Sequence, residues 1–412
     1  MRHRIHDRAL ACFFVSLVLA TSAGCGSTAS ASSIAPIKIG VIEPENTSYY
    51  NAPDELAAAR AAVRAVDAAG GIKGRRIEVD FCNSQNDPNA TASCARELIS
   101  DGVVAVDPSI DVQGPQMVEQ LRQAGIPVVN ETALYPQEFT ARNAFLFYGG
   151  PEGYVASDVV NAADNGLHKI ALVVNQGVPV DTYVAAVKAA AAKVGSEYKG
   201  DVLIPMTPVS DYAPYAQALL SSGADAVVDP LGVNQEIPLI QAMKEIGSKQ
   251  TSILNDGGVT VASLASGSLN GSLLVTTAPP VTPLTESAIP AIATFAKQMQ
   301  AEERSGDPTA SLSAGNGRPT FQLRDWASLE ALFNVMKSIN GTITAHSVMH
   351  ALTTAHGVSV DGVYPPWNPA ATVNLIGISG ARVSEPYAWL NRIENGAEQP
   401  VRKAPLDWSK YL

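Results

Sequence analysis

Carboxylates that follow short apolar runs are the residues of this chain whose type and placement could do chemistry. Asp107 follows the run Val103–Val106, and Asp229 ends the run Ala226–Asp229. Carboxylate oxygens accept hydrogen bonds from amines, amides and hydroxyls, and they repel a second carboxylate at close range. The pattern therefore indicates a site for a polar ligand rich in hydrogen-bond donors. The acids in such positions are Glu43, Asp107, Asp111, Glu131, Asp181, Asp229 and Asp256.

Each of these acids also has a structural interpretation, because Asp caps helices and stabilises turns. Asp111 lies just before the helix expected at Gly114, so capping and ligand binding stay equally open for it. Asp107 precedes a proline, which favours a role in a turn. Glu131 with Thr132 is the better binding candidate, since a buried strand end rarely carries Glu for structure alone.

Motifs of enzymes are missing from the sequence. It holds no Gly-x-Ser-x-Gly elbow, no Gly-x-x-x-x-Gly-Lys phosphate loop and no Gly-x-Gly-x-x-Gly after a strand. His346 and His350 are four residues apart on an expected helix, which is possible metal spacing. An ordinary helix face is favoured, because the Glu of a zinc protease is absent and only His356 could be a third ligand. We therefore expect a protein that is not an enzyme and carries no cofactor or metal.

The elements that must hold these residues alternate between strand and helix patterns. Ile37–Ile42 is apolar without a helical period, and Arg76–Phe81 alternates apolar with polar side chains, as strands do. Between them, Pro53–Ala68 has helix composition, with Pro at its start and Gly70-Gly71 as its stop. The alternation restarts after Gly149, and further helices come late in the chain, over Pro290–Arg304 and Trp326–Ile339. We therefore predict an α/β fold of two doubly wound parallel-sheet lobes.

Composition narrows the class of protein further. The chain has 412 residues, of which 46% are hydrophobic and only 16% charged, with a net charge of −11. Soluble domains average about 25% charged residues, so the low charge suits Ala-rich helices packed on buried sheets. The apolar content excludes general disorder. The negative charge argues against a nucleic-acid binder, because neutralising phosphates takes clustered Lys and Arg.

The N-terminus has the pattern of a bacterial lipoprotein signal. Three early arginines precede Ala9–Ala23, an apolar run shorter than the ~20 residues of a spanning helix. Small residues then lead directly to Cys25, which we expect to carry a lipid; a plain secretory signal is the alternative. The expected parts are a signal over 1–24 and a flexible tether over 25–35. The mature protein would be anchored at the outer face of the cytoplasmic membrane.

Cys82 and Cys94 are the cysteines that remain once the signal and Cys25 are set aside. In an oxidising compartment an isolated pair so close in sequence is expected to form a disulfide. A two-ligand metal site and free core thiols are the alternatives, but no His or acidic spacing nearby supports either of them.

Several runs resemble the type I periplasmic binding proteins of branched-chain amino-acid ABC transporters. The first is 65–74, Ala-Val-Asp-Ala-Ala-Gly-Gly-Ile-Lys-Gly, in which a helix ends at the Gly-Gly. Ile77-Glu78-Val79 and Asn86-Asp87-Pro88 follow in the order of that family. Gly125–Val129 and Leu273–Thr276 match later in the chain, so the similarity extends in order through most of its length.

The resemblance implies two lobes joined by three crossovers, with a ligand in the cleft and hinge closure around it. We expect the crossovers near 148–151, 277–280 and 356–361. The first lobe would then comprise 36–148 and 280–355, and the second lobe 149–279 and 356–412.

The resemblance also implies where a ligand is held. Amino-acid-binding relatives use hydroxyls in the second and third loops for the ligand, and these positions here hold Asp111 and Thr132. Tyr49 and Tyr50 stand where relatives place an aromatic against the ligand, although one of them can pack on the hinge. Tyr183 could serve similarly or belong to the apolar first turn of its helix. The predicted ligand contacts are Tyr49, Tyr50, Asp111, Glu131, Thr132, Asp181, Tyr183 and Asp256.

The function expected from these observations is that of an extracytoplasmic solute-binding lipoprotein. It would capture a small polar ligand and deliver it to an ABC permease and its ATPase, as a monomer held to the membrane by its lipid. Most of the residues with which amino-acid-binding relatives hold their ligand are absent here. We therefore expect weak or no binding of leucine, isoleucine and valine. An extracellular ligand sensor of the same fold is the alternative, and a secreted hydrolase is disfavoured by the missing nucleophile and base.

Overall fold

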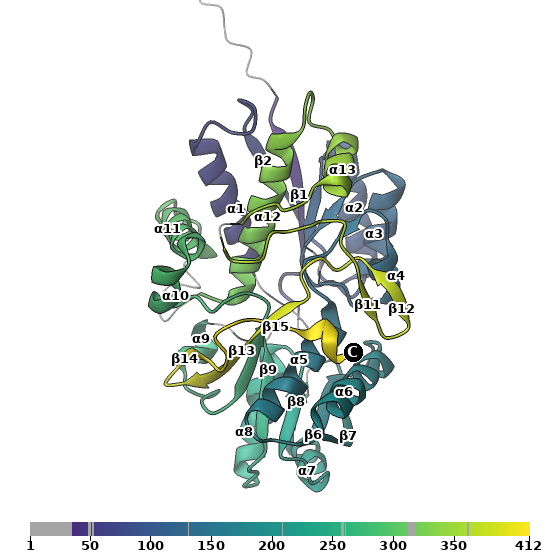
Figure 1. Ribbon diagram of the computed structural model, residues 1–412, viewed down its shortest axis with the longest axis vertical. Helices are drawn as coiled ribbons and strands as arrows, with labels where there is room; N and C mark the ends of the chain where they lie inside the picture. Colours follow the sequence, from purple (N-terminus) through teal and green to yellow (C-terminus); the bar gives the residue numbers. More distant parts are fainter. Residues whose placement is uncertain are drawn as a thin grey trace, which may run out of the picture. The chain divides into compact units, whose positions relative to one another are not determined.

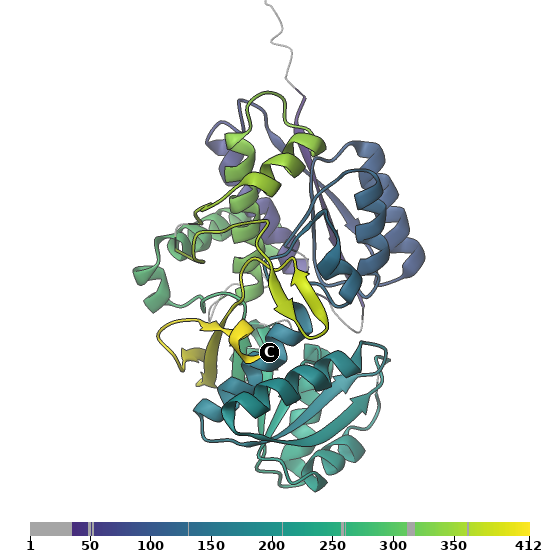
Figure 2. The same cartoon turned by 45° about the vertical axis from the view of Figure 1, so that its right-hand side comes forward.

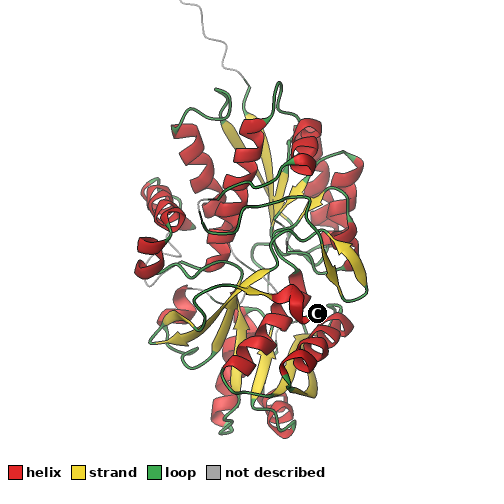
Figure 3. Ribbon diagram, viewed as in Figure 1, coloured by secondary structure: helices red, strands yellow, loops and turns green. Residues whose placement is uncertain are grey.

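Two sheets, each with helices on both faces, make up the part of the chain that the structure describes (Figures 1 and 3). This computed structural model describes residues 35–47, 51, 53–130, 132–207, 209–256, 259, 261–310, 318–360 and 362–412. The predicted signal and Cys25 lie outside these residues, as do Tyr49, Tyr50 and Glu131. The α/β class predicted from the sequence is confirmed.

The first sheet has five parallel strands in the order β2-β1-β3-β4-β5. The chain moves outward from β1 in both directions, so its right-handed crossovers put helices on both faces of the sheet. The strands are Ile37–Glu43 (β1), Ile77–Asn83 (β2), Val106–Pro108 (β3), Val128–Val129 (β4) and Ala144–Phe145 (β5), and the helices between them are Pro53–Ala68 (α1), Pro88–Asp101 (α2), Gly114–Gln123 (α3) and Pro136–Thr140 (α4).

Local sequence signals explain where helix α2 begins and ends. The side chain of Asp87 accepts hydrogen bonds from the backbone N–H groups of Asn89 and Ala90, which caps the helix. Pro88 occupies the first turn, where its missing N–H costs no hydrogen bond. Gly102 ends the helix in the left-handed conformation, with φ of 73°. The Asp-Pro start expected from the sequence is therefore present.

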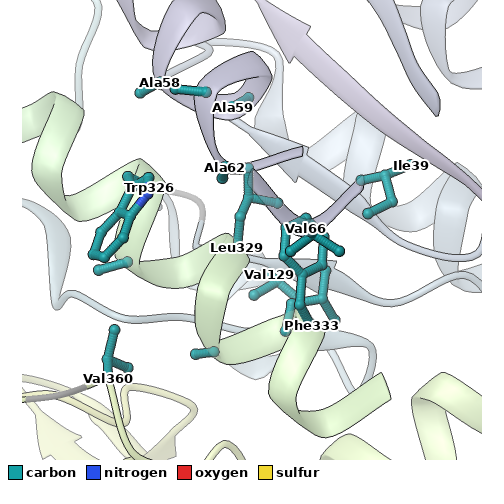
Figure 4. Close-up of a cluster of buried hydrophobic side chains, with 14 of the residues drawn as sticks. Ile39, Ala58, Ala59, Ala62, Val66, Val129, Trp326, Leu329, Phe333 and Val360 are labelled. Atoms are coloured by element: carbon teal, nitrogen blue, oxygen red, sulfur yellow. The ribbon is translucent and has the colours of Figure 1, made fainter. Parts of the chain in front are cut away.

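Helix α12 (Thr320–Ser338) comes late in the chain but packs against α1. Leu329 and Phe333 of α12 lie beside Ala62 and Val66 of α1 (Figure 4). All four side chains are buried. The small alanines of α1 let the two helices approach closely, and burying each Leu or Phe side chain stabilises the fold by roughly 1.5–3 kcal/mol. This packing joins distant parts of the sequence into one core.

The second sheet begins as a parallel sheet and ends as an antiparallel one. Strands β7, β6, β8, β9 and β10 are parallel neighbours. Strand β13 then pairs antiparallel with β10, β14 and β15, which the sequence patterns did not predict. The strands are Lys169–Asn175 (β6), Glu197–Ile204 (β7), Ala226–Asp229 (β8), Thr251–Asn255 (β9), Leu273–Thr276 (β10), Tyr387–Glu394 (β13), Ala397–Pro400 (β14) and Leu406–Asp407 (β15).

The remaining elements cover the two sheets or connect them. Helix α5 packs on the second sheet against α6 and strand β10, and α11 packs on the first sheet against α1. These elements are Gly150–Asp164 (α5), Val180–Val194 (α6), Ala213–Ser221 (α7), Val233–Glu245 (α8), Val261–Ala265 (α9), Pro283–Ala288 (α10), Pro290–Arg304 (α11), Ala345–Thr354 (α13), the hairpin Val373–Leu375 (β11) with Ile378–Ala381 (β12), and a final 3₁₀ turn, Trp408–Tyr411 (η3).

The segment that leads to β13 packs on the first sheet. Val360 and Trp367 belong to the core that contains α1 and α12. The β11–β12 hairpin is visible as two yellow-green arrows in Figure 2. The residues after it pair with the first sheet's side of the chain: the carbonyl of Arg382 accepts from the N–H of Leu146, and the N–H of Ser384 donates to the carbonyl of Leu146. The lobe boundaries stay a prediction, and this packing favours placing the last one after Ser384 instead of at 356.

The turn η3 closes over the start of α5. A Cβ atom on Gly149 or Gly153 would collide with the ring of Trp408, so only glycine leaves room for this indole. Trp408 is fully buried and lies edge-on to Tyr148. The last residues of the chain are therefore part of the core around Tyr148 and the start of α5.

Cys82 and Cys94 form a disulfide, as predicted from their spacing. The bond joins the end of β2 to the middle of α2, with the two Cα atoms 5.5 Å apart. Closing so short a loop stabilises the fold by about 3 kcal/mol in the chain-entropy model.

No helix within the described ranges is both long enough and apolar enough to span a bilayer. This finding does not include the apolar run of the predicted signal, because that run lies outside those ranges.

Candidate functional site

The parallel strands of the two sheets follow the same order. In the first sheet β1 and β3 are neighbours with their helices leaving in opposite directions, and in the second sheet β6 and β8 repeat this arrangement. Ligands of such sheets bind beyond the carboxyl ends of the two strands where the order reverses. We call the end of β1 and β3 the first switch point, and the end of β6 and β8 the second switch point.

Buried carboxyls from strands and helices meet at the first switch point. Glu43 ends β1 and Asp107 lies in β3, while Glu55 comes from α1 and Asp325 from α12. All four are at most 5% exposed. The side-chain amide of Asn130 donates to Asp107 Oδ1 at 3.1 Å and to Asp325 Oδ1 at 2.7 Å. One amide therefore holds two carboxyls of different elements together.

Burial raises the pKa of Glu43 and of Asp107 well above the usual range of carboxyls. Neighbouring carboxyls raise it further, because Glu55 lies near Glu43 and Asp325 lies near Asp107. Burial raises the pKa of Asp325 as well, against the opposing effect of Arg324. These acids therefore favour the neutral, protonated form more strongly than exposed carboxyls do.

Arg324 is the buried cation of this region. Its guanidinium is fully buried, lies 3.7 Å from the centre of the Phe321 ring and donates from Nη1 to Thr132 Oγ1 at 2.8 Å. Its Nη2 lies 3.4 Å from Asp325 Oδ1. Burial alone lowers the pKa of Arg324, but the acids around it, Asp325 first, raise it overall. Arg324 therefore offsets part of the negative charge and holds the third loop through Thr132.

The second switch point is acidic too. Asp229 ends β8, and Glu236 lies in the first turn of α8; both are fully buried. Among the described residues, no hydrogen-bond partner is found for either oxygen of Glu236 or for Asp229 Oδ2. Burial raises the pKa of Asp229 to about 7. Asp158 of α5 lies near both acids and accepts from the side-chain amide of Asn255.

Asp256 forms hydrogen bonds with elements that belong to the two different sheets and their helices. Its Oδ1 accepts from Tyr154 Oη of α5 at 2.8 Å. Its Oδ2 accepts from the N–H of Thr277 at 2.7 Å, from the Thr277 hydroxyl at 2.8 Å and from the Thr320 hydroxyl at 3.0 Å. Thr277 directly follows β10 and Thr320 begins α12. Asp256 is therefore a structural junction with both oxygens engaged, and its predicted ligand contact stays a prediction.

The other predicted ligand contacts have various surroundings. Asp111 is buried and accepts from the N–H of Gln113 at 2.7 Å and from the Thr91 hydroxyl at 3.2 Å, so it stabilises the turn before α3. Asp181 is exposed in the first turn of α6. Tyr183 is buried in the core between α5 and α6. The structure does not test whether any of them touches a ligand, and Tyr49, Tyr50 and Glu131 lie outside the described residues.

The site residues that lie on helices were not predicted from the sequence. Glu55 lies on α1 and Arg324 with Asp325 on α12, whereas the predicted site residues lie in or near the loops that follow strands. A usable signal was present: an Arg-Asp pair stands in the apolar segment that becomes α12. Charges buried on a helix must be paired, so such a pair points to a polar network.

No group of three His, Cys, Asp or Glu side chains in the described ranges is arranged to hold a metal ion. His346 and His350 lie on α13 as predicted, and both are exposed.

Stability is expected to fall as the pH rises through the range set by the buried acids. Burial raises the pKa of Glu385 from 4.5 to about 8, so the folded protein keeps a proton there that the unfolded chain has lost. The contribution of Glu385 to the free energy of unfolding is therefore complete in acid and is lost as the pH rises from 4.5 to about 8. Glu385→Gln should remove this pH dependence, which amounts to a change in the free energy of unfolding on the order of a few kcal/mol across the range.

Chemical unfolding across this pH range measures the effect. Glu245→Gln is the matched control, since Glu245 is exposed on α8. If the slope of Glu385→Gln equals that of the control, Glu385 does not hold its proton in the folded protein.

The family of the chain follows from its match to known proteins. A family model described as periplasmic binding protein matches residues 36–374. The chain belongs to this family. The resemblance found in the sequence is thus confirmed, and the matched segment of this periplasmic binding protein contains both switch points and Asp256.

Relatives and solved structures agree with the family. Leu/Ile/Val-binding protein homolog 3 of Brucella melitensis is 30% identical over 222 residues, which cover 52% of this chain and 58% of that relative. The fatty acid ABC transporter substrate-binding protein of Thermomonospora curvata has a TM-score of 0.73 at 17% identity, covering 91% of this chain and 94% of its own. A solute binding protein of Rhodopseudomonas palustris in complex with 3,4-dihydroxy benzoic acid has a TM-score of 0.69 at 16% identity, covering 90% and 97%. The match to the curated relative thus spans little more than half of that relative's length.

These comparisons set the general role of this periplasmic binding protein. Its fold is that of solute-binding and ligand-receptor proteins, and the proteins it resembles include a ligand-binding receptor and substrate-binding components of transporters, which are not enzymes. Membership of the family implies a location outside the cytoplasm.

Proposed function

We propose that this chain is a lipid-anchored solute-binding protein that captures a small polar solute and delivers it to an ABC permease and its ATPase. It would act as a monomer, anchored through Cys25 to the outer face of the cytoplasmic membrane. The solute would bind between two lobes that close about their crossovers.

Buried polar groups at the first switch point are the observation that carries this proposal. The carboxyl ends of parallel strands at such a point are the usual ligand site of an open α/β sheet. Here they hold Glu43 and Asp107, both nearly fully buried, where an ordinary core would hold apolar side chains. Burying such polar groups costs free energy, so their presence supports a role in holding a solute.

Two other predicted ligand contacts, Thr132 and Asp111, argue against branched-chain amino acids as the solute. Thr132 Oγ1, a predicted ligand contact, already accepts a hydrogen bond from Arg324. Asp111, which stands where relatives hold the ligand, would repel a carboxylate, and its own oxygens accept from Gln113 and Thr91. A free amino acid would therefore lose most of its hydrogen-bond partners at these positions.

Calorimetry with leucine, isoleucine and valine, beside a thermal-shift screen of amines, amides, polyols and organic acids, tests the proposal. We expect no measurable heat from the three amino acids and a saturable rise in melting temperature with another small solute. Micromolar or tighter leucine binding would refute the exclusion of branched-chain amino acids. A screen without any saturable solute would contradict solute binding itself.

Anchoring is tested separately with the full chain. Cys25→Ser should move the protein from the membrane fraction to the soluble extract, because the lipid is the only expected membrane attachment. Met117→Leu, a buried change far from the signal, serves as the control and should stay in the membrane fraction. If Cys25→Ser also stays with the membrane, the lipid anchor is wrong.

A further inference from the structure

A small cavity lies at the first switch point. Glu43 of β1, Ser109 directly after β3 and Asp325 of α12 line it, together with Glu55 and Asp107. The cavity offers about 10 Å³ to a group the size of a water molecule, which is room for one such group. We call it the switch-point cavity.

Three lining residues carry oxygens without partners. Glu43 Oε2, Ser109 Oγ and Asp325 Oδ2 are buried and accept or donate no hydrogen bond within the described residues. Their side chains belong to residues that are 5%, 3% and 5% exposed. Leaving such groups unpaired costs roughly 1–3 kcal/mol each. Oxygens of three residues thus converge on one cavity that could hold a single small donor, although the Asp325 carboxyl can also pair with Glu55.

Charge decides what kind of group fits. Four carboxyls line the cavity, and Arg324 is the cation beside them, with its guanidinium directed to Thr132 and Asp325. An anion would be repelled, and each carboxyl that ionises here calls for a further positive charge. A group bound in this cavity is therefore best a cation.

Size and hydrogen-bonding capacity narrow the class of cation. A primary ammonium carries three N–H donors and no acceptor, which suits three orphaned oxygens. A guanidinium is a planar fork with five N–H donors and exceeds a space for one water-sized group. No metal-binding group of three His, Cys, Asp or Glu is found among the described residues, so a metal ion is not favoured.

We propose that the switch-point cavity binds the primary ammonium group of the solute, so that the protein is a receptor for amines. This inference rests on the proposed solute-binding function. Glu43 and Asp325 supply the negative charge, and Ser109 supplies the third acceptor. The rest of the solute would extend from the cavity beyond the strand ends.

Proton coupling follows from the surroundings of Glu43. The titratable groups that face it are Asp54 and Glu55 of α1, Asp107 of β3 and Asp325 of α12. Because burial favours the neutral form of Glu43, an ammonium must displace a proton to form an ion pair. Amine affinity should therefore rise as the pH goes from mildly acidic to mildly basic.

Propylammonium chloride is the probe, applied to the mature chain in calorimetry and thermal shift at constant ionic strength. We expect saturable binding that tightens with pH and releases protons into the buffer. Tetramethylammonium, which has no N–H donor and is too large, and 1-propanol, which has no charge, should show no saturable effect. Equal effects of all three probes, or none from propylammonium, would overturn the proposal.

Two variants and a matched control locate the site. Glu43→Gln and Ser109→Ala should each weaken propylammonium binding, the first by roughly tenfold or more, as loss of a charged partner does. Glu119→Gln changes an exposed acid of α3 and should bind like the parent. Two conservative variants are used so that a folding defect in one, seen as a lower melting temperature, leaves the other informative.

The outcomes separate this inference from the proposed function. A neutral or anionic solute that binds saturably and is indifferent to both variants overturns the ammonium site and leaves solute binding in place. Saturable stabilisation by sodium or potassium chloride that disappears in Glu43→Gln also overturns it, because the cavity would then hold a monatomic cation.

Discussion

Replacing Arg324 with Met is expected to destabilise the protein by about 3–5 kcal/mol, because removing one partner leaves buried charges without compensation. Arg324 is fully buried, holds Thr132 through a hydrogen bond and offsets the charge of Asp325. Met keeps much of the length and the contact with Phe321 but none of the charge. The acids of the first switch point would then have to take up protons or separate.

Urea unfolding near neutral pH measures this loss. Arg122→Met is the control, since Arg122 pairs with Glu119 on the surface of α3 with its side chain 45% exposed; such pairs contribute about 0–1 kcal/mol. The loss in Arg324→Met should shrink in mild acid, where the acids are protonated. Equal stability of Arg324→Met and the control would show that the guanidinium does not compensate the acids.

Asp256→Ala is expected to cost about 3–5 kcal/mol, because it leaves several buried donors without an acceptor. Tyr154, Thr277 and Thr320 all donate to this carboxylate. These residues lie in α5, directly after β10 and at the start of α12, so the loss would also loosen the connection between the elements of the two sheets.

Asp256→Asn is the matched variant for this prediction. Asn keeps one oxygen for Thr277 and Thr320, and the hydroxyl of Tyr154 can turn to accept from the new amide, so the cost should fall to about 1–2 kcal/mol. Thermal and urea unfolding compare the two variants. If Asp256→Ala is no less stable than Asp256→Asn, the junction does not hold these elements together.

Local signals made much of the fold predictable. Helices α1 and α11 have the bounds expected from the sequence, because a Pro marks each start and the apolar pattern lies within one segment. Strands β13–β15 were not predicted, since their pairing depends on β10, a partner more than a hundred residues earlier. A short antiparallel strand is recognised by what it pairs with, and that information is not local.

The candidate site was predictable only in part. Glu43, Asp107 and Asp229 lie at strand ends as expected, because a polar residue after an apolar run marks the carboxyl end of a buried strand. Arg324 and Asp325 were missed, because the helix was expected to start at Trp326 and instead starts at Thr320. Which helix side chains reach a switch point depends on packing between distant segments, which no single window of sequence contains.

The second sheet is completed by residues that the family match does not reach. The match ends at 374, whereas β13 pairs with β10 over residues 389–392 and Trp408 fills the space over Gly149. A fragment trimmed to the matched segment would expose β10 as an apolar edge, and open edges of this kind join other copies of the chain. The boundary for producing a well-behaved fragment therefore lies beyond Trp408.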